Sequence, residues 1–348
     1  MTGFPGFIGG RLLERLLKPE TQYFLLVQKR FVKSAMIELE RLAEVSNIPL
    51  DSFVIVEGDI TYPQLGISVK DLETIQYETT DVFHLAAAYD LAVPKDVAFN
   101  VNLQGTKNVN DLVCSIKNLR RYNYVSTCYV AGKREGDILE TELVHKGGFR
   151  NFYEETKYLA EIEVESLKSH IPLTIFRPSV VVGDSKTGET TKYDGIYYLI
   201  NYLRRAPSLL RILNVGNPLV RLNLVPVDFV AEAIATLAFD KRAVGKTVAI
   251  ADPRPLTTSE LFDVIAKDLT GRKSEFAPSA KLAEWFLRTG LSPSVTGLPH
   301  HSVPYFFISQ NYDCQISREL LATHRLGCPR FENYVGNLLD FVEENPTL

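Results

Sequence analysis

A tyrosine and a lysine four residues apart, Tyr153 and Lys157, could move a proton together. They lie in an amphipathic segment, 151–169, that predicts a helix, and their spacing places both side chains on one face of it. An ammonium beside a phenol stabilises the phenolate, so it lowers a pKa that is ordinarily about 10 and lets the tyrosine exchange protons near neutrality. One such pair among 16 tyrosines can arise by chance, so its meaning depends on its surroundings.

Two hydroxyl residues, Ser126 and Thr127, precede that tyrosine by 27 and 26 residues. They follow the apolar run 122–125, which predicts a buried strand. Ligands of open α/β sheets bind beyond the carboxyl ends of the strands, so the two hydroxyls are placed where a ligand is expected.

The glycine-rich segment 2–9 is the third feature. Gly3, Gly6 and Gly9 lead directly into the amphipathic run 11–17. This spacing lets the backbone approach a pyrophosphate, and the N-terminus of the following helix adds N–H donors and the positive end of its dipole. A glycine triplet alone is as consistent with a surface turn, but a strand ends about 20 residues later, where βαβ units place the residue that contacts the ribose. The three features together indicate dinucleotide-dependent redox chemistry.

Gln28, Lys29 and Arg30 occupy that ribose position, which carries no acid. An Asp or Glu would hydrogen-bond a free 2′-hydroxyl and repel a phosphate, whereas cations favour a 2′-phosphate. The sequence therefore favours NADP(H) over NAD(H). The alternative is that Lys29 and Arg30 belong to an ordinary solvated loop.

Short apolar runs alternate with amphipathic segments over the first half of the chain, which predicts a Rossmann-type, doubly wound parallel α/β sheet with helices on both faces. The expected strands are 23–27, 53–56, 81–85, 122–125 and 173–176, and the expected helices are 9–18, 33–46, 96–117 and 151–169. Later helical stretches, at 193–203, 228–240, 258–269 and 279–288, predict a smaller, interleaved C-terminal lobe. We expect a cofactor domain over 1–184, to which 220–252 returns, and a substrate-binding lobe over most of 185–348.

Only Met1 and Thr2 precede the glycine turn, although such a turn normally follows the central first strand. Without that strand, its neighbours would lose hydrogen-bonding partners and core surface. We expect the natural protein to carry about five to eight more apolar residues upstream, the length of a typical strand. The intact mass of natively expressed protein tests this expectation.

Composition excludes several other classes of protein. With 45% hydrophobic and 23% charged residues, the 348-residue chain is neither disordered nor collagen-like nor a coiled coil. A net charge of −4 argues against nucleic acid as a partner. Four cysteines without CxxC spacing predict a reduced, cytoplasmic chain with neither zinc nor disulfides, and no other metal site is expected. No apolar run approaches the roughly 18 residues of a membrane span.

The motifs carry a resemblance to a known family. Along nearly its whole length the chain resembles an extended short-chain dehydrogenase/reductase. The matching pieces are TGFPGFIG at 2–9, GDI at 58–60, HLAA at 84–87, NLQGT at 102–106, Ser126 with Thr127, YEETK at 153–157, Arg177 with Pro178, PVD at 226–228 and the closing segment 312–329. The chain departs from the family at Pro5, where the glycine turn often has Thr.

The resemblance implies a role for each matching residue. Tyr153 would be the general acid, and Lys157 would hold the nicotinamide ribose and tune the tyrosine. Thr127 would be the catalytic hydroxyl, with Ser126 as the alternative. The cofactor would contact Gly3, Gly6, Phe7, Ile8 and Gly9 at the turn, Lys29 and Arg30 at the ribose, Asp59 and Ile60 at the adenine, Leu85, Ala86 and Ala87 along its length, and Pro178, Ser179 and Val180 at the nicotinamide. A homodimer is also implied.

Within that family, the segment 58–68 is similar to the GDxTxPxLGLS signature of fatty acyl and thioester reductases, and VSTCYV at 125–130 resembles their VSTAYV. This implies NADPH-dependent reduction of acyl-CoA or carrier-bound thioesters to aldehyde or alcohol, with Thr127 and Tyr153 bonding the developing oxyanion. The alternatives are an oxidoreductase of a ketone or alcohol on a hydrophobic small molecule, a sugar-nucleotide epimerase, and a non-catalytic NADP(H)-binding scaffold.

Several other residues receive a structural interpretation. The apolar segments 197–203, 282–287 and 304–308 could house an acyl chain, but lobe core is the simpler interpretation. His84 is expected to be a packed residue, and the adjacent His300 and His301 are not spaced as a metal pair on a helix. Glu154 and Glu155 are expected to face solvent at a helix N-terminus, where acids are favoured.

Overall fold

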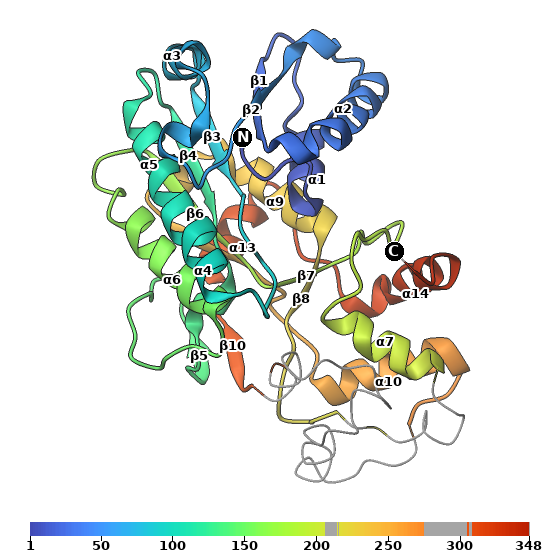
Figure 1. Ribbon diagram of the computed structural model, residues 1–348. Coiled ribbons are helices and arrows are strands. Elements are labelled where there is room, and N and C mark those ends of the chain that lie inside the picture. Colours follow the sequence, from blue (N-terminus) through green and yellow to red (C-terminus); the bar gives the residue numbers. More distant parts are fainter. Residues whose placement is uncertain (206–213, 215, 275–304, 306–307, 348) are drawn as a thin grey trace.

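A parallel sheet forms the centre of the molecule in the computed structural model, which describes residues 1–205, 214, 216–274, 305 and 308–347 (Figure 1). Its strand order is β3-β4-β6-β9, and β1 pairs with β2. These strands are β1 (Tyr23–Val27), β2 (Phe53–Glu57), β3 (Asp81–His84), β4 (Arg121–Val125), β6 (Leu173–Pro178) and β9 (Thr247–Ile250). All the pairs are parallel, and Val125 of β4 lies opposite Phe176 of β6.

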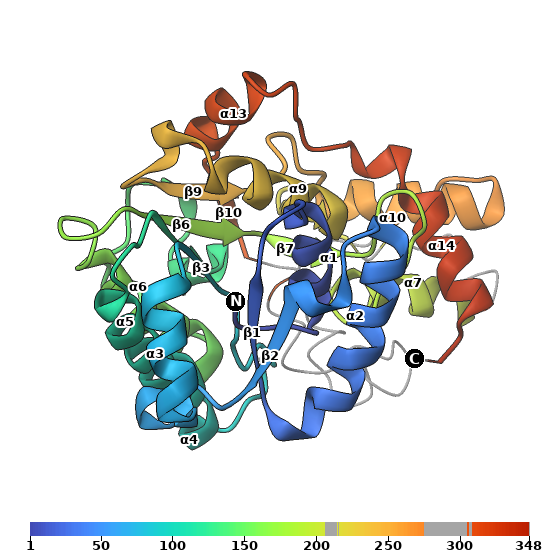
Figure 2. The ribbon, with the colours of Figure 1, turned by 90° about the horizontal axis from the view of Figure 1, so that it is seen from above.

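Helices cover both faces of the sheet, which confirms the doubly wound arrangement (Figure 2). On one face, Val113 of α5 and Val164 of α6 pack with Tyr122 of β4. On the other face, α1, α9 and α13 cover Phe176. The helices of this part are α1 (Phe7–Leu16), α2 (Val32–Ser46), α3 (Val69–Glu78), α4 (Lys95–Ala98), α5 (Gly105–Ser115), α6 (Phe152–Glu165), α9 (Val227–Ala238) and α13 (Gln315–Ala322).

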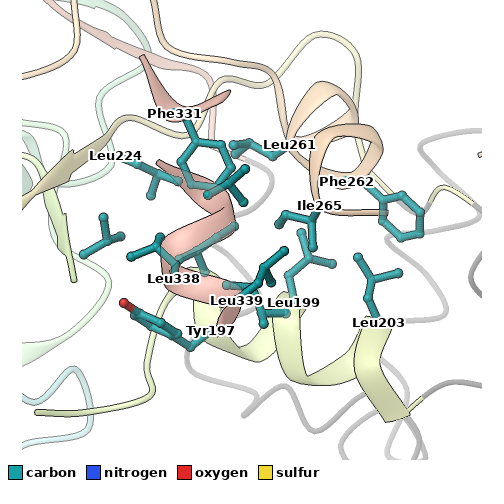
Figure 3. Close-up of a cluster of buried hydrophobic side chains, with 14 of the residues drawn as sticks. Tyr197, Leu199, Leu203, Leu224, Leu261, Phe262, Ile265, Phe331, Leu338 and Leu339 are labelled. Atoms are coloured by element: carbon teal, nitrogen blue, oxygen red, sulfur yellow. The ribbon is translucent and has the colours of Figure 1, made fainter. Parts of the chain in front are cut away.

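A second hydrophobic core lies in the C-terminal lobe, where three helices pack together (Figure 3). They are α7 (Ile196–Arg205), α10 (Thr258–Thr270) and α14 (Val335–Glu344). Tyr197 and Leu203 of α7 are buried in this core beside Phe262 and Leu338. The segment 197–203 is thus lobe core, as the simpler interpretation held, whereas 282–287, His300 and His301 lie outside the described residues, as does 304–308 apart from Tyr305 and residue 308.

Short strand pairs connect the lobe to the sheet. β7 (Val180–Val182) pairs with β8 (Leu224–Pro226), and β5 (Gly136–Ile138) pairs with β10 (Gln310–Tyr312). Through β8, α9 and β9 the chain returns from the lobe to the edge of the main sheet, beside β6. In the part of the chain that the structure describes, no helix is long and apolar enough to cross a membrane.

Thr2 lies between β1 and β3, the position of the strand that normally leads into a glycine turn. It forms isolated parallel bridges to Leu26 of β1 and His84 of β3. Its N–H donates to the carbonyl of Phe83 (2.9 Å), and Leu26 donates to the carbonyl of Met1 (2.9 Å). A cavity of about 410 Å³ extends beyond these bridges between β1, β3 and α1.

The helix expected over 96–117 is interrupted. A π-helical turn, Phe99–Gln104, separates α4 from α5. Asn102 within this turn points inward, where its side chain accepts from the N–H of Ala88 (2.7 Å) and donates to the hydroxyl of Thr156 (3.0 Å). These buried hydrogen bonds link the loop after β3 to α6, which the helical pattern alone did not reveal.

Candidate active site

The glycine turn fits closely against the end of β3. Gly3 has a φ of +87°, which favours glycine, and a Cβ built there would lie 2.8 Å from the Cβ of Leu85 and 2.9 Å from the N of Ala86. The N–H of Gly6 donates to the carbonyl of Gly3 (2.9 Å). A Cβ built at Gly9 would collide with the same carbonyl oxygen. The helix α1 begins directly after Gly6, whose missing side chain leaves the first N–H groups open to an anion. The turn therefore fits a pyrophosphate.

Thr2 fastens this turn to β3. Its hydroxyl oxygen accepts from the N–H groups of Leu85 (3.2 Å) and Ala86 (3.1 Å) and lies 2.7 Å from Nδ1 of His84. Burial lowers the pKa of His84 to about 3, with a further contribution from Lys157, so this histidine is neutral at working pH. His84 is 1% exposed, as expected for a packed residue.

The residues expected at the ribose lie together at the carboxyl ends of β1 and β2. Arg30 Nε donates to Oε1 of Gln28 (2.9 Å), whose Nε2 donates to Oδ2 of Asp59 (2.7 Å). Arg30 and Lys29 are exposed, and Ile60, the other expected adenine contact, is buried. The structure thus brings the exposed cations of one strand end next to the expected adenine contacts of the other.

Thr127 and Tyr153 meet at the end of β4. Thr127 begins the short turn Cys128–Ala131, where its hydroxyl accepts from the N–H of Tyr129 (3.2 Å). Tyr153 is in the first turn of α6, which Asn151 caps by accepting from the N–H of Glu154 (2.9 Å). Burial raises the pKa of Tyr153 to about 12, although a hydrogen bond with Thr127 opposes the rise. The phenol is therefore protonated at neutral pH.

This direction corrects the expectation that Lys157 brings the tyrosine near neutrality. The ammonium instead donates to the hydroxyl of Tyr124 (3.0 Å) and to the carbonyl of Val125 (3.0 Å). Burial lowers the pKa of Lys157 to about 8, and Glu161 opposes this. In this structure the lysine is thus bonded to β4, and its third N–H has no partner among the described residues.

Ser126, the alternative catalytic hydroxyl, has a different environment. It donates to the buried carboxylate of Glu161, which also forms an ion pair with Arg177 (Nε to Oε1, 2.8 Å). Arg177 further donates to the carbonyl of Glu142 (3.0 Å). Of the two hydroxyls, Thr127 is beside Tyr153, while Ser126 belongs to a buried ionic cluster.

The nicotinamide-side residues lie where β6 ends. Ser179 donates its hydroxyl proton to Oδ1 of Asn223 (2.8 Å), and the N–H of Val180 donates to the Asn223 carbonyl (3.2 Å). Pro178 is the last residue of β6, next to the end of β4. These residues therefore border the same edge of the sheet as Thr127.

Glu154 does not face solvent as expected. It is fully buried, with Oε1 accepting from the hydroxyl of Tyr305 (2.6 Å) and Oε2 from the N–H of Arg150 (2.9 Å). The ring of Tyr305 lies 4.7 Å, between centroids, from that of Tyr129. Tyr305 is far from Glu154 in the chain and leaves no local signal, so the sequence pattern missed this buried cluster beside Tyr153.

The family model for male sterility protein, an NAD-binding domain, matches residues 1–234. The chain belongs to this male sterility protein family. The matched range of this NAD-binding domain includes the glycine turn.

Known members and neighbours of the male sterility protein family resemble the chain at moderate identity. The putative fatty acyl-CoA reductase CG8306 of Drosophila melanogaster is 29% identical over 280 residues, 69% of this chain and 54% of the relative. The fatty acyl-CoA reductase wat of the same fly is 27% identical over 277 residues, 69% and 53%. The chain thus spans about half the length of these curated relatives.

Among solved structures, the terminal R domain from the myxalamid PKS-NRPS biosynthetic pathway has a TM-score of 0.81 at 23% identity, covering 100% of this chain and 90% of that one. At this identity the likeness shows the fold alone, which agrees with the Rossmann-type architecture predicted for this member of the family.

Proposed function

We propose that this chain is an NADPH-dependent reductase of acyl thioesters. The observation that carries the proposal is the meeting of Thr127 with a protonated Tyr153 at the end of β4, one helical turn from Lys157. A binding-only module has no need of such a proton donor. The two fatty acyl-CoA reductases named above support the substrate class.

The two hydroxyls account for the chemistry at the substrate carbonyl. Bound NADPH supplies the hydride. As negative charge develops on the thioester oxygen, the hydroxyls of Thr127 and Tyr153 hydrogen-bond it, and Tyr153 transfers its proton to form a hemithioacetal. The phenolate of Tyr153, whose conjugate acid has a raised pKa of about 12, then removes that proton. The C–S bond breaks, giving an aldehyde and a thiolate that takes up a proton from solvent.

Other residues would hold the cofactor. The glycine turn and the first N–H groups of α1 would bind the pyrophosphate, and Lys29 and Arg30 the 2′-phosphate. Asp59 and Ile60 would border the adenine. The remaining N–H of Lys157 would donate to the nicotinamide ribose. The nicotinamide ring would lie beside Pro178, Ser179 and Val180. This arrangement supports NADP(H) over NAD(H).

The two parts of the chain would divide the work. Residues 1–184, with 220–252, would bind the cofactor, and the lobe within 185–348 would select the acyl group. A structural neighbour is a thiolation-reductase di-domain, which supports carrier-bound thioesters beside acyl-CoA as substrates. The four cysteines are free thiols, which supports a reducing compartment such as the cytoplasm. The homodimer stays a prediction.

The test is NADPH oxidation with acyl-CoAs, a carrier-bound acyl thioester, aldehydes and ketones. We expect thioesters to stimulate oxidation, and Tyr153→Phe to lower kcat about 10²- to 10⁴-fold, the contribution of a positioned acid. Tyr158→Phe, a tyrosine of the same helix, is the matched control and should keep its activity. Oxidation stimulated by ketones alone, or unchanged turnover in Tyr153→Phe, would refute the proposal.

A further inference from the structure

A chain of buried hydrogen bonds connects Lys157 to the glycine turn. The ammonium donates to the hydroxyl of Tyr124 (3.0 Å), and that phenol is hydrogen-bonded to Thr106. The hydroxyl oxygen of Thr106 lies 3.1 Å from Nε2 of His84, and Nδ1 of the same ring lies 2.7 Å from the hydroxyl of Thr2. Thr2 immediately precedes the glycine turn and accepts from the N–H groups that follow β3.

The direction of each hydrogen bond follows from the donors available. Thr106 donates its proton to the carbonyl of Asn102 (2.6 Å), so its oxygen accepts from Tyr124 and from Nε2 of His84. A neutral histidine protonated on Nε2 accepts on Nδ1, which takes the proton of Thr2. Since the hydroxyl of Tyr124 donates its hydrogen bond to Thr106, its oxygen accepts the hydrogen bond from the ammonium through a lone pair. Every link thus has one donor and one acceptor.

We propose that Tyr124 is a positioning residue of the active site: its hydroxyl, fixed by Thr106, holds the ammonium of Lys157 at the end of β4 and ties its place to the glycine turn. The ring contributes as well, because the ammonium lies 4.6 Å from its centroid. The inference rests on the proposed function only where Lys157 serves the cofactor, since the placement of its ammonium can be measured without turnover.

The groups that face Lys157 come from three elements. Glu161 and Tyr153 lie one turn away on either side in α6, Tyr124 is on β4 and His84 on β3. Burial raises the pKa of Tyr124 far above its usual range and that of Tyr153 to about 12, and lowers that of His84 to about 3. These three side chains therefore stay neutral while Lys157 titrates near pH 8. Glu161, in its ion pair with Arg177, raises the pKa of the lysine.

Tyr124→Phe tests the proposal, because it keeps the ring and removes the hydroxyl. Tyr122→Phe is a matched control: Tyr122 lies on the same strand, equally buried, and its hydroxyl donates to Oδ1 of Asn110 (2.9 Å) instead. The readout is the titration of the Lys157 ¹³Cε resonance in lysine-labelled full chain, assigned by its loss in Lys157→Arg. We expect the pKa of Lys157 to fall by about one unit in Tyr124→Phe, since the charged form loses an acceptor, and to stay unchanged in Tyr122→Phe.

An unchanged pKa in Tyr124→Phe, or an equal shift in Tyr122→Phe, would overturn the proposal. Should Tyr124→Phe not fold, Thr106→Val and Thr106→Ser replace it, because only serine keeps the hydroxyl that fixes Tyr124. Valine is then expected to shift the titration and serine to restore it, and equal values in the two variants would overturn the proposal. Failure of the proposed function is separate: wild-type chain that reduces no thioester refutes that function, whereas the titration still decides the role of Tyr124.

Discussion

Replacing Arg30 by alanine should weaken NADPH binding and leave NADH binding nearly unchanged. The side chain is already oriented in this structure. Its Nε donates to Gln28 (2.9 Å), and its guanidinium lies 4.7 Å from the ring centroid of Phe31. Gln28 is fixed in turn by Asp59 (2.7 Å). The remaining N–H groups of the guanidinium can therefore bind a 2′-phosphate with little further loss of side-chain conformational entropy.

The magnitude follows from the charge and the exposure of this side chain. A hydrogen bond to a charged group contributes about 1.5–3 kcal/mol, which corresponds to about 10- to 150-fold in affinity. Because Arg30 is exposed, solvent and salt screen the interaction, and the lower part of that range applies. We expect the Kd of NADPH to rise about 10- to 30-fold in Arg30→Ala, and more at low salt than at high salt.

Fluorescence titration of the two dinucleotides at low and high salt measures this effect. Arg41→Ala is the matched control, because Arg41 is a cation of α2 that pairs with Glu38 (2.7 Å), and its removal changes the net charge equally. An unchanged Kd for NADPH would show that Arg30 belongs to an ordinary solvated loop. An equal loss for NADPH and NADH would show that the residue stabilises the turn and does not select the phosphate.

Three further predictions concern the turn, the hydroxyls and the buried histidine. Thr127→Val should lower kcat about 10²-fold by removing an oxyanion donor. Ser126→Ala should keep kcat and lower the free energy of unfolding by about 1–3 kcal/mol, because a buried carboxylate loses its donor. Steady-state kinetics and urea unfolding separate the two effects. Gly3→Ala should abolish dinucleotide binding in calorimetry, since its φ is +87° and its Cβ would lie 2.8 Å from the Cβ of Leu85, just after β3. With the pKa of His84 at about 3 in the folded chain and about 6.5 when unfolded, only the unfolded state binds this proton between those values. Stability should therefore fall by about 2 kcal/mol from pH 6.5 to 4.5, and His84→Gln should show a smaller slope.

The fold could be predicted from the sequence because its strands are locally marked. Strands buried on both faces are apolar runs, and the expected 23–27 matches β1 residue for residue, while 122–125 differs from β4 by one residue. The glycine turn was also recognisable, because its geometry needs a residue type that few others can replace. The π-helical turn within 96–117 was not, because it depends on buried hydrogen bonds of Asn102 to two other elements.

The site could be predicted in its residues but not in their bonding. Spacing placed Tyr153 and Lys157 on one helical face, yet spacing says nothing of the strand beneath, where Tyr124 and a carbonyl take two donors of the lysine. Similarly, Glu154 is an acid in the first turn of a helix, for which exposure is the usual state. It is buried because Arg150 forms an ion pair with it and Tyr305, far along the chain, supplies a further donor.

The polar groups at the end of β4 differ in the hydrogen bonds that they already make within the protein. Ser126 donates to Glu161, and Arg177 forms an ion pair with that carboxylate. The hydroxyl of Ser126 and the carboxylate of Glu161 are thus already bonded within the protein. Tyr153 is hydrogen-bonded to Thr127, whose hydroxyl also accepts from the N–H of Tyr129, and both hydroxyls can turn to an incoming carbonyl oxygen. Residue type alone would rank serine and threonine equally. The buried ion pair beneath the serine distinguishes them, because moving Ser126 towards a substrate would leave a desolvated carboxylate without its donor.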